Sequence, residues 1–467
     1  MKRKEKKSGL RQELEDFLGE PEPKASEPSE DQEEQKLPEK EPQGEKSKNS
    51  RSLPQLVREK YRAADARRQL ERADNDVIFQ EPLKPAPPPD ESVPLKRGGI
   101  DMWFLLWAML LIGFGAVMSY SASAVYAERY YDSSSYFLWR YLLFSAVAIV
   151  VTALFVIYAR PWFWRVFGAG AYIVSIFLLL LVLVIGSTGG GAQRWLNLKI
   201  ITIQPSEVAK MAVVMMLALY MSKYEKQICS THKFGGSFKY GFLMPMVIIG
   251  VICGLIALEK HISGLMIVGM IGVAVMFMGG TRLKYLGAFL GIIVVAGVLL
   301  ILVSDYAQER VAIWWDIENA DPLGSAWQTL QGLYAIGSGG FFGLGLGSSR
   351  QKFGYVSQPQ NDFIFSIICE ELGFLGAFIL ILLFALLIWR GIKIGQRAPD
   401  KFCALVVWGL TFKIGLQVAM NLAVVTNSMP NTGISLPFFS SGGSSLMLQI
   451  FEIGIILSIS RFSTQKK

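Results

Sequence analysis

Histidine and cysteine are scarce in this chain of 467 residues, which holds two histidines and four cysteines. His232 and His261 supply too little material for a histidine-based metal site or a Ser-His-Asp triad. The cysteines show no CxxC spacing, so neither structural disulfides nor a thiolate metal site is expected. Any catalysis should therefore depend on carboxylates.

The chain opens without an apolar run, because residues 1–4 read MKRK and lead into charged, proline-rich sequence. A cleavable signal peptide is not predicted, so the N-terminus should stay on the side where it is made. Residues 1–98 mix Glu, Lys, Pro, Ser and Gln, which predicts a disordered cytoplasmic tail. Within it, residues 53–78 could form a basic amphipathic helix on anionic lipid or a partner, or only a transient solvated helix.

Long apolar runs dominate the chain after the tail. The composition is 52% hydrophobic and the mean hydropathy is +0.36, which is too apolar for a soluble protein. A bilayer core about 30 Å thick needs roughly 20 apolar residues per helix. Ten such runs follow one another between polar breaks. Residues 99–467 are therefore expected to form an all-α polytopic membrane protein with ten transmembrane helices and both termini on one side.

Basic residues concentrate in the breaks that follow the even-numbered spans, as Arg160 and Arg165 illustrate. The positive-inside rule makes these breaks and both termini cytoplasmic. The opposite side carries a large extracytoplasmic loop between spans 7 and 8, residues 305–362, and loops of this length are usually lids or functional sites. Because the basic residues are scattered, the net charge of +8 does not indicate nucleic-acid binding.

Ionisable groups inside apolar sequence are costly and mark candidate functional positions. Glu207 and Lys210 share one helix face after Pro205, as a functional pair or as a structural ion pair. Asp321 lies in a DPLG turn between tryptophans, which could desolvate its carboxylate and make it a better base. Asp362 is interpreted as a helix cap.

Three further polar or glycine-rich features lie beside the spans. Gln417 and Asn421 are predicted to form interhelical hydrogen bonds. Two adjacent glutamates, at residues 370–371, lie within apolar sequence. The glycine-rich residues 337–347 are either a backbone nest for phosphate or, on the simpler interpretation, a tightly packed re-entrant loop.

Residues 421–445 read NLAVVTNSMPNTGISLPFFSSGGSS, which resembles the signature of the SEDS family (shape, elongation, division and sporulation), to which FtsW, RodA and SpoVE belong. The matching positions are Pro430, Gly433, Pro437, Phe438, Ser440, Gly442, Gly443 and Ser444. Residues 191–210, 321–355 and 359–373 also resemble the family. The resemblance covers residues 99–463 and is closer to FtsW and SpoVE than to RodA. Departures lie at residues 259–261, 356–358 and 441.

The resemblance implies a peptidoglycan glycosyltransferase that polymerises lipid II into glycan strands during cell division. It implies an inverting transfer with Asp321 as the general base, and a divalent cation, Mg²⁺ or Mn²⁺, at a site that the sequence does not locate. The residues expected to bind substrate are Arg194, Trp195, Glu207, Lys210, Gln328, Ser440, Gly442 and Gly443.

The same resemblance implies a multi-pass protein of the bacterial inner membrane, at the division septum. Expected partners are lipid II, a class B penicillin-binding protein transpeptidase and, through residues 1–98, other division proteins. The main alternative is a lipid II flippase or transporter, which ten spans with polar interior residues would also suit. A scaffold without activity is a third interpretation, and the intact Asp321 motif argues against it.

Overall fold

The computed structural model describes residues 98–462, apart from 190–191, 198–201, 230–236, 304, 318, 320, 322–323, 325, 357–358 and 441–442. Apart from Gly98, the predicted tail lies outside the described residues, and so does its possible helix at 53–78.

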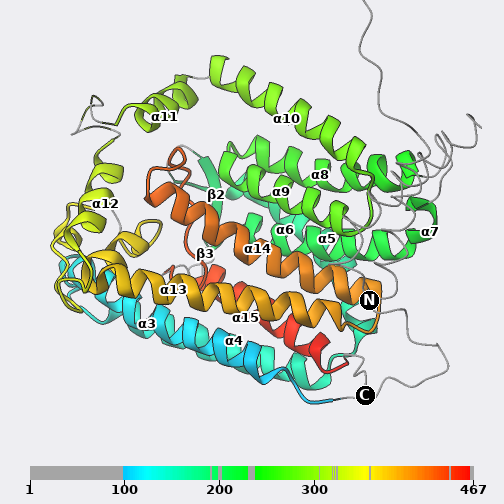
Figure 1. Ribbon diagram of the computed structural model, residues 1–467, viewed down its shortest axis with the longest axis horizontal. Coiled ribbons are helices and arrows are strands. Elements are labelled where there is room, and N and C mark those ends of the chain that lie inside the picture. Colours follow the sequence, from blue (N-terminus) through cyan, green and yellow to red (C-terminus); the bar gives the residue numbers. More distant parts are fainter. Residues whose placement is uncertain are drawn as a thin grey trace, which may run out of the picture. The chain divides into compact units, whose positions relative to one another are not determined.

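The described chain is helical and carries one small sheet (Figure 1). Its helices are α3 (Met102–Tyr131), α4 (Tyr136–Tyr158), α5 (Pro161–Ile185), α6 (Pro205–Lys223), α7 (Glu225–Ile228), the π-helical turn η1 (Lys239–Leu243), α8 (Met244–Leu258), α9 (Ile262–Met278), α10 (Leu283–Val303), α11 (Asp305–Trp315), α12 (Trp327–Ser338), the 3-10 turn η2 (Gln351–Phe353), α13 (Ile364–Gln396), α14 (Lys401–Val425) and α15 (Gly443–Ser460). The antiparallel strands β1 (Ser187–Gly189), β2 (Ala192–Asn197) and β3 (Thr202–Ile203) pair in the order β1-β2-β3.

Seven helical segments among the described residues are long and apolar enough to cross a membrane, namely α3, α4, α5, η1 with α8, α13, α14 and α15. Helix α9 and the first half of α10 are shorter apolar helices. This confirms the prediction of a mainly helical polytopic membrane protein, whereas the number of ten spans stays a prediction.

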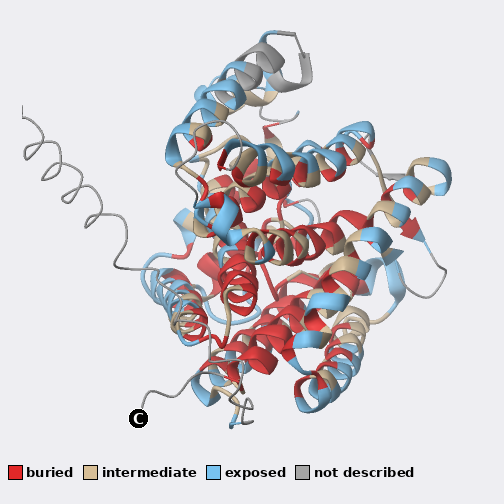
Figure 2. Cartoon of the chain, turned by 90° about the vertical axis from the view of Figure 1, so that its right-hand side faces the viewer, coloured by how far each residue is buried: buried red, intermediate tan, exposed pale blue. Residues whose placement is uncertain are grey.

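The interior of the bundle is built from α6, α14 and α15. The apolar windows of α14 and α15 are each 78% buried, whereas that of α4 is 28% buried. Helix α6 packs against α5, α8, α9 and α14, and its side chains are buried on nearly all sides. A helix that is buried on nearly all sides lies in the interior of the bundle, and α6 carries its polar residues Glu207 and Lys210 there as well. Buried segments accordingly fill the middle of the bundle, and the outer helices expose one face (Figure 2).

We call the end of the bundle where both described chain ends meet the proximal end, and there the Gly98 N–H donates to the Arg461 carbonyl at 2.7 Å. Two helix caps stabilise this end. Asp101 caps α3 by accepting from the Phe104 N–H at 3.0 Å, and the Arg390 Nε donates to the same carboxylate at 2.9 Å. Asp400 caps α14 and forms an ion pair with Arg165. Each aspartate thus satisfies a free helix N–H and ties two helices together.

Helix α13 is broken at Gly373, which has a φ of 67° and a ψ of −165°. The N–H groups of Phe374 and Leu375 donate to the carbonyls of Gly340 and Phe341, at 2.9 and 3.1 Å, instead of to carbonyls one helical turn back. The glycine-rich segment therefore inserts its backbone into the break.

The inserted backbone also satisfies the carbonyls that the break leaves free. Those of Glu370 and Glu371 accept from the N–H groups of Leu344 and Gly345, at 2.9 and 3.0 Å. A Cβ on Gly343 would lie 2.2 Å from the Glu371 carbonyl oxygen, so only glycine allows this approach. The close-packing interpretation of residues 337–347 is confirmed.

Candidate functional site

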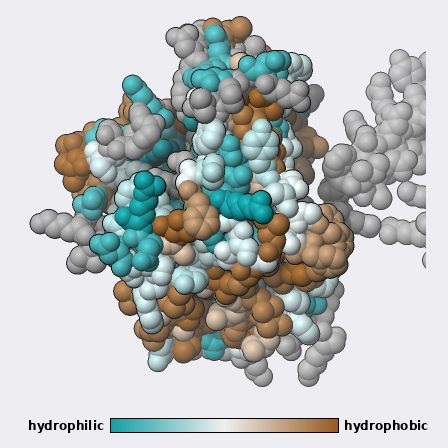
Figure 3. Space-filling model, turned by 90° about the vertical axis from the view of Figure 1, so that its left-hand side faces the viewer, coloured by the Kyte–Doolittle hydropathy of each residue, from teal (hydrophilic) through white to brown (hydrophobic). Residues whose placement is uncertain are grey.

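The loop of residues 426–440 lies at the distal end of the bundle, which we define as the end that carries the sheet and α12. Two elements hold it from outside: the Trp314 Nε1 donates to the Asn427 carbonyl at 3.1 Å, and the Ser263 hydroxyl donates to the Thr432 carbonyl. At this end hydrophilic and hydrophobic surface patches lie side by side (Figure 3).

The inner side of the same loop is fixed by buried polar groups. The Asn421 side chain donates to the carbonyls of Asp362 and Ile434, each at 2.7 Å. The Tyr141 hydroxyl donates to the Phe438 carbonyl at 2.8 Å. Asn421 thus bonds to loop backbone, and the Gln417 Oε1 has no hydrogen-bond partner among the described residues. The prediction that these two side chains join helices directly was therefore wrong.

Five ionisable residues meet beneath this loop, and we call them the distal cluster: Arg194 on β2, Glu207 and Lys210 on α6, His261 at the start of α9, and Asp362 before α13. The Lys210 Nζ lies 2.5 Å from the Glu207 Oε1. Arg194 interacts electrostatically with His261 and Asp362, and His261 with Glu207 and Lys210. Lys210 is 3% exposed, and Glu207 and His261 are each 8% exposed. Such burial strengthens charge interactions.

Burial governs protonation at the rim of the distal cluster. Burial, with the positive charges of Arg194 and Lys210, lowers the pKa of His261 to about 4, so its imidazole is neutral at pH 7. Burial raises the pKa of Asp362 above its usual range, although Arg194 opposes the shift. Asp362 was interpreted as a helix cap, and this is wrong. The N-cap of α13 is Phe363 and no side chain caps it.

A second buried ion pair lies deeper, between α14 and α15. The Lys413 Nζ is 2.5 Å from the Glu452 Oε1, and both side chains are fully buried. The two interact electrostatically with Glu207 and Lys210, so the four charges form one coupled group. This pair was not predicted from the sequence, although a Lys and a Glu inside neighbouring apolar spans indicate a candidate functional or structural pair.

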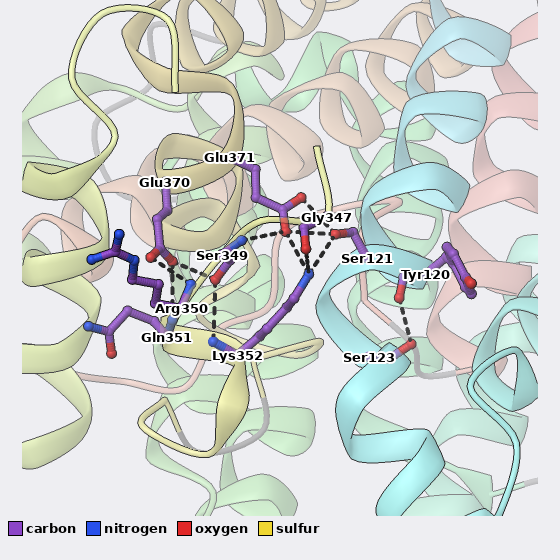
Figure 4. Close-up of polar contacts among 10 residues, drawn as sticks. All are labelled: Tyr120, Ser121, Ser123, Gly347, Ser349, Arg350, Gln351, Lys352, Glu370 and Glu371. Carbon is purple, nitrogen blue, oxygen red and sulfur yellow. Dashed lines mark hydrogen bonds and ion pairs between the residues drawn. The ribbon is translucent and has the colours of Figure 1, made fainter. Parts of the chain in front are cut away.

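A third group, which we call the Lys352 network, joins η2 to α3 and α13 (Figure 4). The Lys352 Nζ lies 3.0 Å from the Glu371 Oε1 and donates to the Gly347 carbonyl at 2.5 Å. The Ser121 hydroxyl donates to both Glu371 oxygens, at 2.7 and 2.6 Å. Glu370 accepts from the Ser349 hydroxyl at 2.5 Å and from the Arg350 N–H at 2.9 Å. These bonds lock the glycine-rich segment onto α13, which is a structural role.

Asp321 lies in the turn that leads into α12 and is exposed. Its carbonyl accepts from the Gly324 N–H at 3.2 Å, and its carboxylate lies close over Gly324. The Trp327 Nε1 donates to the Tyr355 carbonyl at 2.6 Å, which anchors α12 to the segment after η2. The burial expected from the flanking tryptophans is not found, because Asp321 is exposed.

The other predicted substrate-binding residues are distributed around the distal end. Trp195 is half-buried and pairs with Ser187 in the sheet, and Gln328 is half-buried on α12. Ser440 is half-buried, whereas Gly442 lies outside the described residues. Gly443 packs against the Phe144 ring so closely that a Cβ would lie 2.5 Å from it. Of the eight, the structure brings Arg194, Glu207 and Lys210 together.

No group of three or more His, Cys, Asp or Glu residues in the described part of the chain could hold a metal ion. The described side chains alone therefore do not fit a protein-built divalent cation site. Mg²⁺ commonly keeps several waters and binds through one or two carboxylates plus substrate phosphates.

Comparisons with known sequences cover nearly all of the described chain. Residues 101–465 match the family model of the FtsW, RodA and SpoVE cell cycle proteins. Stage V sporulation protein E of Bacillus subtilis (strain 168) is 39% identical over 375 residues, which is 79% of this chain and 99% of that protein. A probable peptidoglycan glycosyltransferase FtsW of Trichlorobacter lovleyi is 36% identical over 371 residues, 79% of this chain and 94% of that protein.

Solved structures give the same fold. A chain from a peptidoglycan synthase complex that coordinates polymerization and crosslinking is similar with a TM-score of 0.62 and 26% identity, covering 79% of this chain and 99% of that one. The rod shape determining protein RodA of Thermus thermophilus is similar with a TM-score of 0.57 and 24% identity, covering 79% and 98%. These findings confirm the resemblance to the SEDS proteins. The chain belongs to the FtsW/RodA/SpoVE family of cell cycle proteins.

Proposed function

We propose that this chain is a peptidoglycan glycosyltransferase that polymerises lipid II into glycan strands during cell division. Relatives between 34% and 36% identical are named as probable peptidoglycan glycosyltransferases. The observation that carries the proposal is the distal cluster, in which Arg194 and buried Lys210 place positive charge beneath the loop of residues 426–440. Such an arrangement suits a pyrophosphate leaving group.

The proposed topology has ten spans: the seven long apolar segments together with α6, α9 and α10. Arg165, Lys401 and Arg390 all lie at the proximal end, which supports a cytoplasmic position for that end and for both termini. The distal end then faces outward, where the growing glycan lies, with a large extracytoplasmic loop between α10 and α13. The protein is multi-pass in the inner membrane, and we place it at the division septum.

The proposed transfer is an inverting displacement at the anomeric carbon of the donor sugar. The 4-hydroxyl oxygen of the acceptor forms the new bond to that carbon, and the bond to undecaprenyl pyrophosphate breaks. The hydroxyl proton passes to the carboxylate of Asp321, which acts as general base. Its exposed position at the distal end leaves it accessible to a sugar hydroxyl. General-base assistance contributes about 10²–10⁴-fold.

The leaving pyrophosphate carries the negative charge that develops in the transition state. Arg194 and Lys210 are the proposed binding groups, and Glu207 orients Lys210 through the 2.5 Å ion pair. Neutral His261 can donate one hydrogen bond and accept another beside them. Trp195, Gln328, Ser440, Gly442 and Gly443 complete the proposed substrate-binding surface.

The proposed partner is a class B penicillin-binding protein transpeptidase, which is supported by the similarity to a chain of a synthase complex that joins polymerization with crosslinking. Other division proteins would bind residues 1–98. We also propose that the reaction uses a divalent cation, Mg²⁺ or Mn²⁺. Phosphate oxygens of the substrate would supply most of its ligands. Chelation with EDTA should then abolish polymerisation, and either metal should restore it.

The test reconstitutes the full chain with its transpeptidase, labelled lipid II and a divalent cation, and resolves the products by size. Wild type should give a glycan ladder, and Asp321→Ala should lose it by about 10²–10⁴-fold. The matched control is Asp316→Ala, since Asp316 is another exposed carboxylate of the same loop and its carboxylate accepts hydrogen bonds from the side chain of Asn319.

Three other outcomes would contradict parts of the proposal. A ladder that persists in Asp321→Ala keeps the polymerase and moves the base elsewhere, with Glu207 tested next. Equal loss in Asp316→Ala would point to loop folding instead of base catalysis. No ladder from wild type, together with lipid II that crosses vesicle bilayers only when the protein is present, would replace polymerisation by transport.

A further inference from the structure

A surface cavity of about 470 Å³ lies where α4 ends and α5 begins, and we call it the α4–α5 groove. Val151, Leu154, Phe155 and Tyr158 line it from one face of α4, since they are spaced three, four and seven residues apart. This volume falls within the about 300–1,000 Å³ of typical small-molecule sites. The groove is at the proximal end, away from the distal cluster.

The groove changes polarity along its length. From Val151 to Tyr158 it follows α4 for about 10 Å, and every side chain there is apolar or aromatic. Its charged lining residue is Arg160, which is exposed and begins α5 as the N-cap. The wall is therefore apolar toward the membrane interior and cationic at the proximal surface. An amphiphile with one acyl chain along α4 and an anionic head at Arg160 has the same polarity.

The charge of Arg160 is available, in contrast to that of its neighbours. Arg165 pairs with Asp400, and the Arg461 guanidinium donates to the Val156 and Ile157 carbonyls at 2.7 and 2.9 Å. The Arg160 guanidinium makes no ion pair or hydrogen bond with another residue that the structure describes. The first turn of α5 adds the positive end of its dipole at the same place.

Aromatic side chains mark the depth at which the head would lie. Tyr158 and Trp162 flank Arg160 and are each 71% exposed. Tyr and Trp exposed on a membrane protein concentrate at the headgroup level. We propose that the α4–α5 groove binds one anionic glycerophospholipid of the leaflet at the proximal end, with its phosphate on Arg160 and an acyl chain against Val151 and Leu154.

The test titrates the purified full chain in detergent with phosphatidylglycerol or phosphatidylcholine and counts bound lipid by native mass spectrometry. Wild type should bind one phosphatidylglycerol about tenfold more tightly than phosphatidylcholine, because the choline cation beside the phosphate of phosphatidylcholine is repelled by Arg160, whereas the head of phosphatidylglycerol carries only the negative charge. Arg160→Gln should remove that preference. Lys226→Gln is the matched control, since Lys226 is an exposed cation of α7 outside the groove, and it should bind as wild type does.

A second variant tests the acyl-chain half of the groove. Val151 is 41% exposed, so Val151→Trp should fill the groove without disturbing the interior, and should weaken phosphatidylglycerol binding about tenfold. Glycerol phosphate, which has the head but no chain, should not compete. Wild-type binding by Arg160→Gln, equal binding of both lipids by wild type, or full competition by glycerol phosphate would each overturn the proposal.

Discussion

Substitutions of Lys413 and Glu452 would measure how much one buried ion pair contributes to the free energy of unfolding, because both side chains are fully buried and the Lys413 Nζ lies 2.5 Å from the Glu452 Oε1. Lys413→Met leaves the Glu452 carboxylate without its cation, and we expect a loss of about 3–5 kcal/mol in unfolding free energy. The double variant Lys413→Met/Glu452→Gln removes both charges and should recover most of that loss. Thermal unfolding in detergent measures both, and equal losses in the single and double variants would contradict the pairing.

Glu259 is the C-cap that follows α8 and is 2% exposed, and neither of its carboxylate oxygens has a hydrogen-bond partner among the described residues. Burial raises its pKa from 4.5 to about 8. Between these two values the folded protein keeps a proton that the unfolded chain releases, so the free energy of unfolding falls as the pH rises. From pH 7 to pH 8 the expected fall is about 1 kcal/mol.

Glu259→Gln cannot titrate and should abolish this fall, which denaturant unfolding at several pH values would measure. His261 has the opposite slope, since its pKa is lowered from 6.5 to about 4 and the unfolded imidazole binds the extra proton. Its effect lies mainly in more acidic solution, so His261 contributes little to the slope between pH 7 and pH 8, and the comparison with Glu259→Gln gives the share that belongs to Glu259. Exposed Glu128 serves as control, and Glu128→Gln should keep the wild-type slope.

At the scale of elements, the break in α13 depends on Gly373. Its positive φ disfavours other residues, and a Cβ there would lie 2.3 Å from the Gly343 nitrogen. Gly373→Ala should therefore lower the melting temperature strongly by displacing the inserted segment. Gly337→Ala, on α12 with open space around it, should leave the melting temperature unchanged or raise it. Similar behaviour of the two variants in thermal unfolding would contradict the insertion.

The sequence predicted elements better than it predicted contacts between them. Apolar periodicity located the spans, because a helix in a bilayer must satisfy its backbone internally and cover its surface with apolar side chains. The i,i+3 spacing placed Glu207 beside Lys210. Lys413 and Glu452 lie 39 residues apart, and their contact depends on how α14 packs on α15. Local spacing carries no information about that packing.

The same limit explains the remaining differences at the distal end. The glycine-rich segment was recognised as a packing element, but its insertion at Gly373 arises from two segments that only the folded chain brings together. Nothing in the sequence around Lys352 predicts that its side chain is buried against Glu371. Asp321 was located by its motif, whereas its exposure was not, because exposure depends on how the whole loop packs.

At the scale of the whole molecule, the proposed orientation in the membrane can be measured with cysteines. Cys229 follows α7 and is exposed, whereas Cys369 and Cys403 are buried. A membrane-impermeant maleimide should leave Cys229 unlabelled in intact spheroplasts and label it in inside-out vesicles. The control is Asp316→Cys in a Cys229→Ser background, which should be labelled in spheroplasts, because Asp316 is exposed after α11.

Labelling of Cys229 in intact spheroplasts would reverse the orientation and have consequences beyond topology. Asp321 belongs to the same loop as Asp316, so a reversed protein would carry its proposed general base on the cytoplasmic side. Glycan strands are built outside the membrane, and a base on the other side could not accept the proton of the attacking hydroxyl. The polymerase proposal would then fall together with the orientation, whereas lipid binding in the α4–α5 groove would survive with its leaflet exchanged.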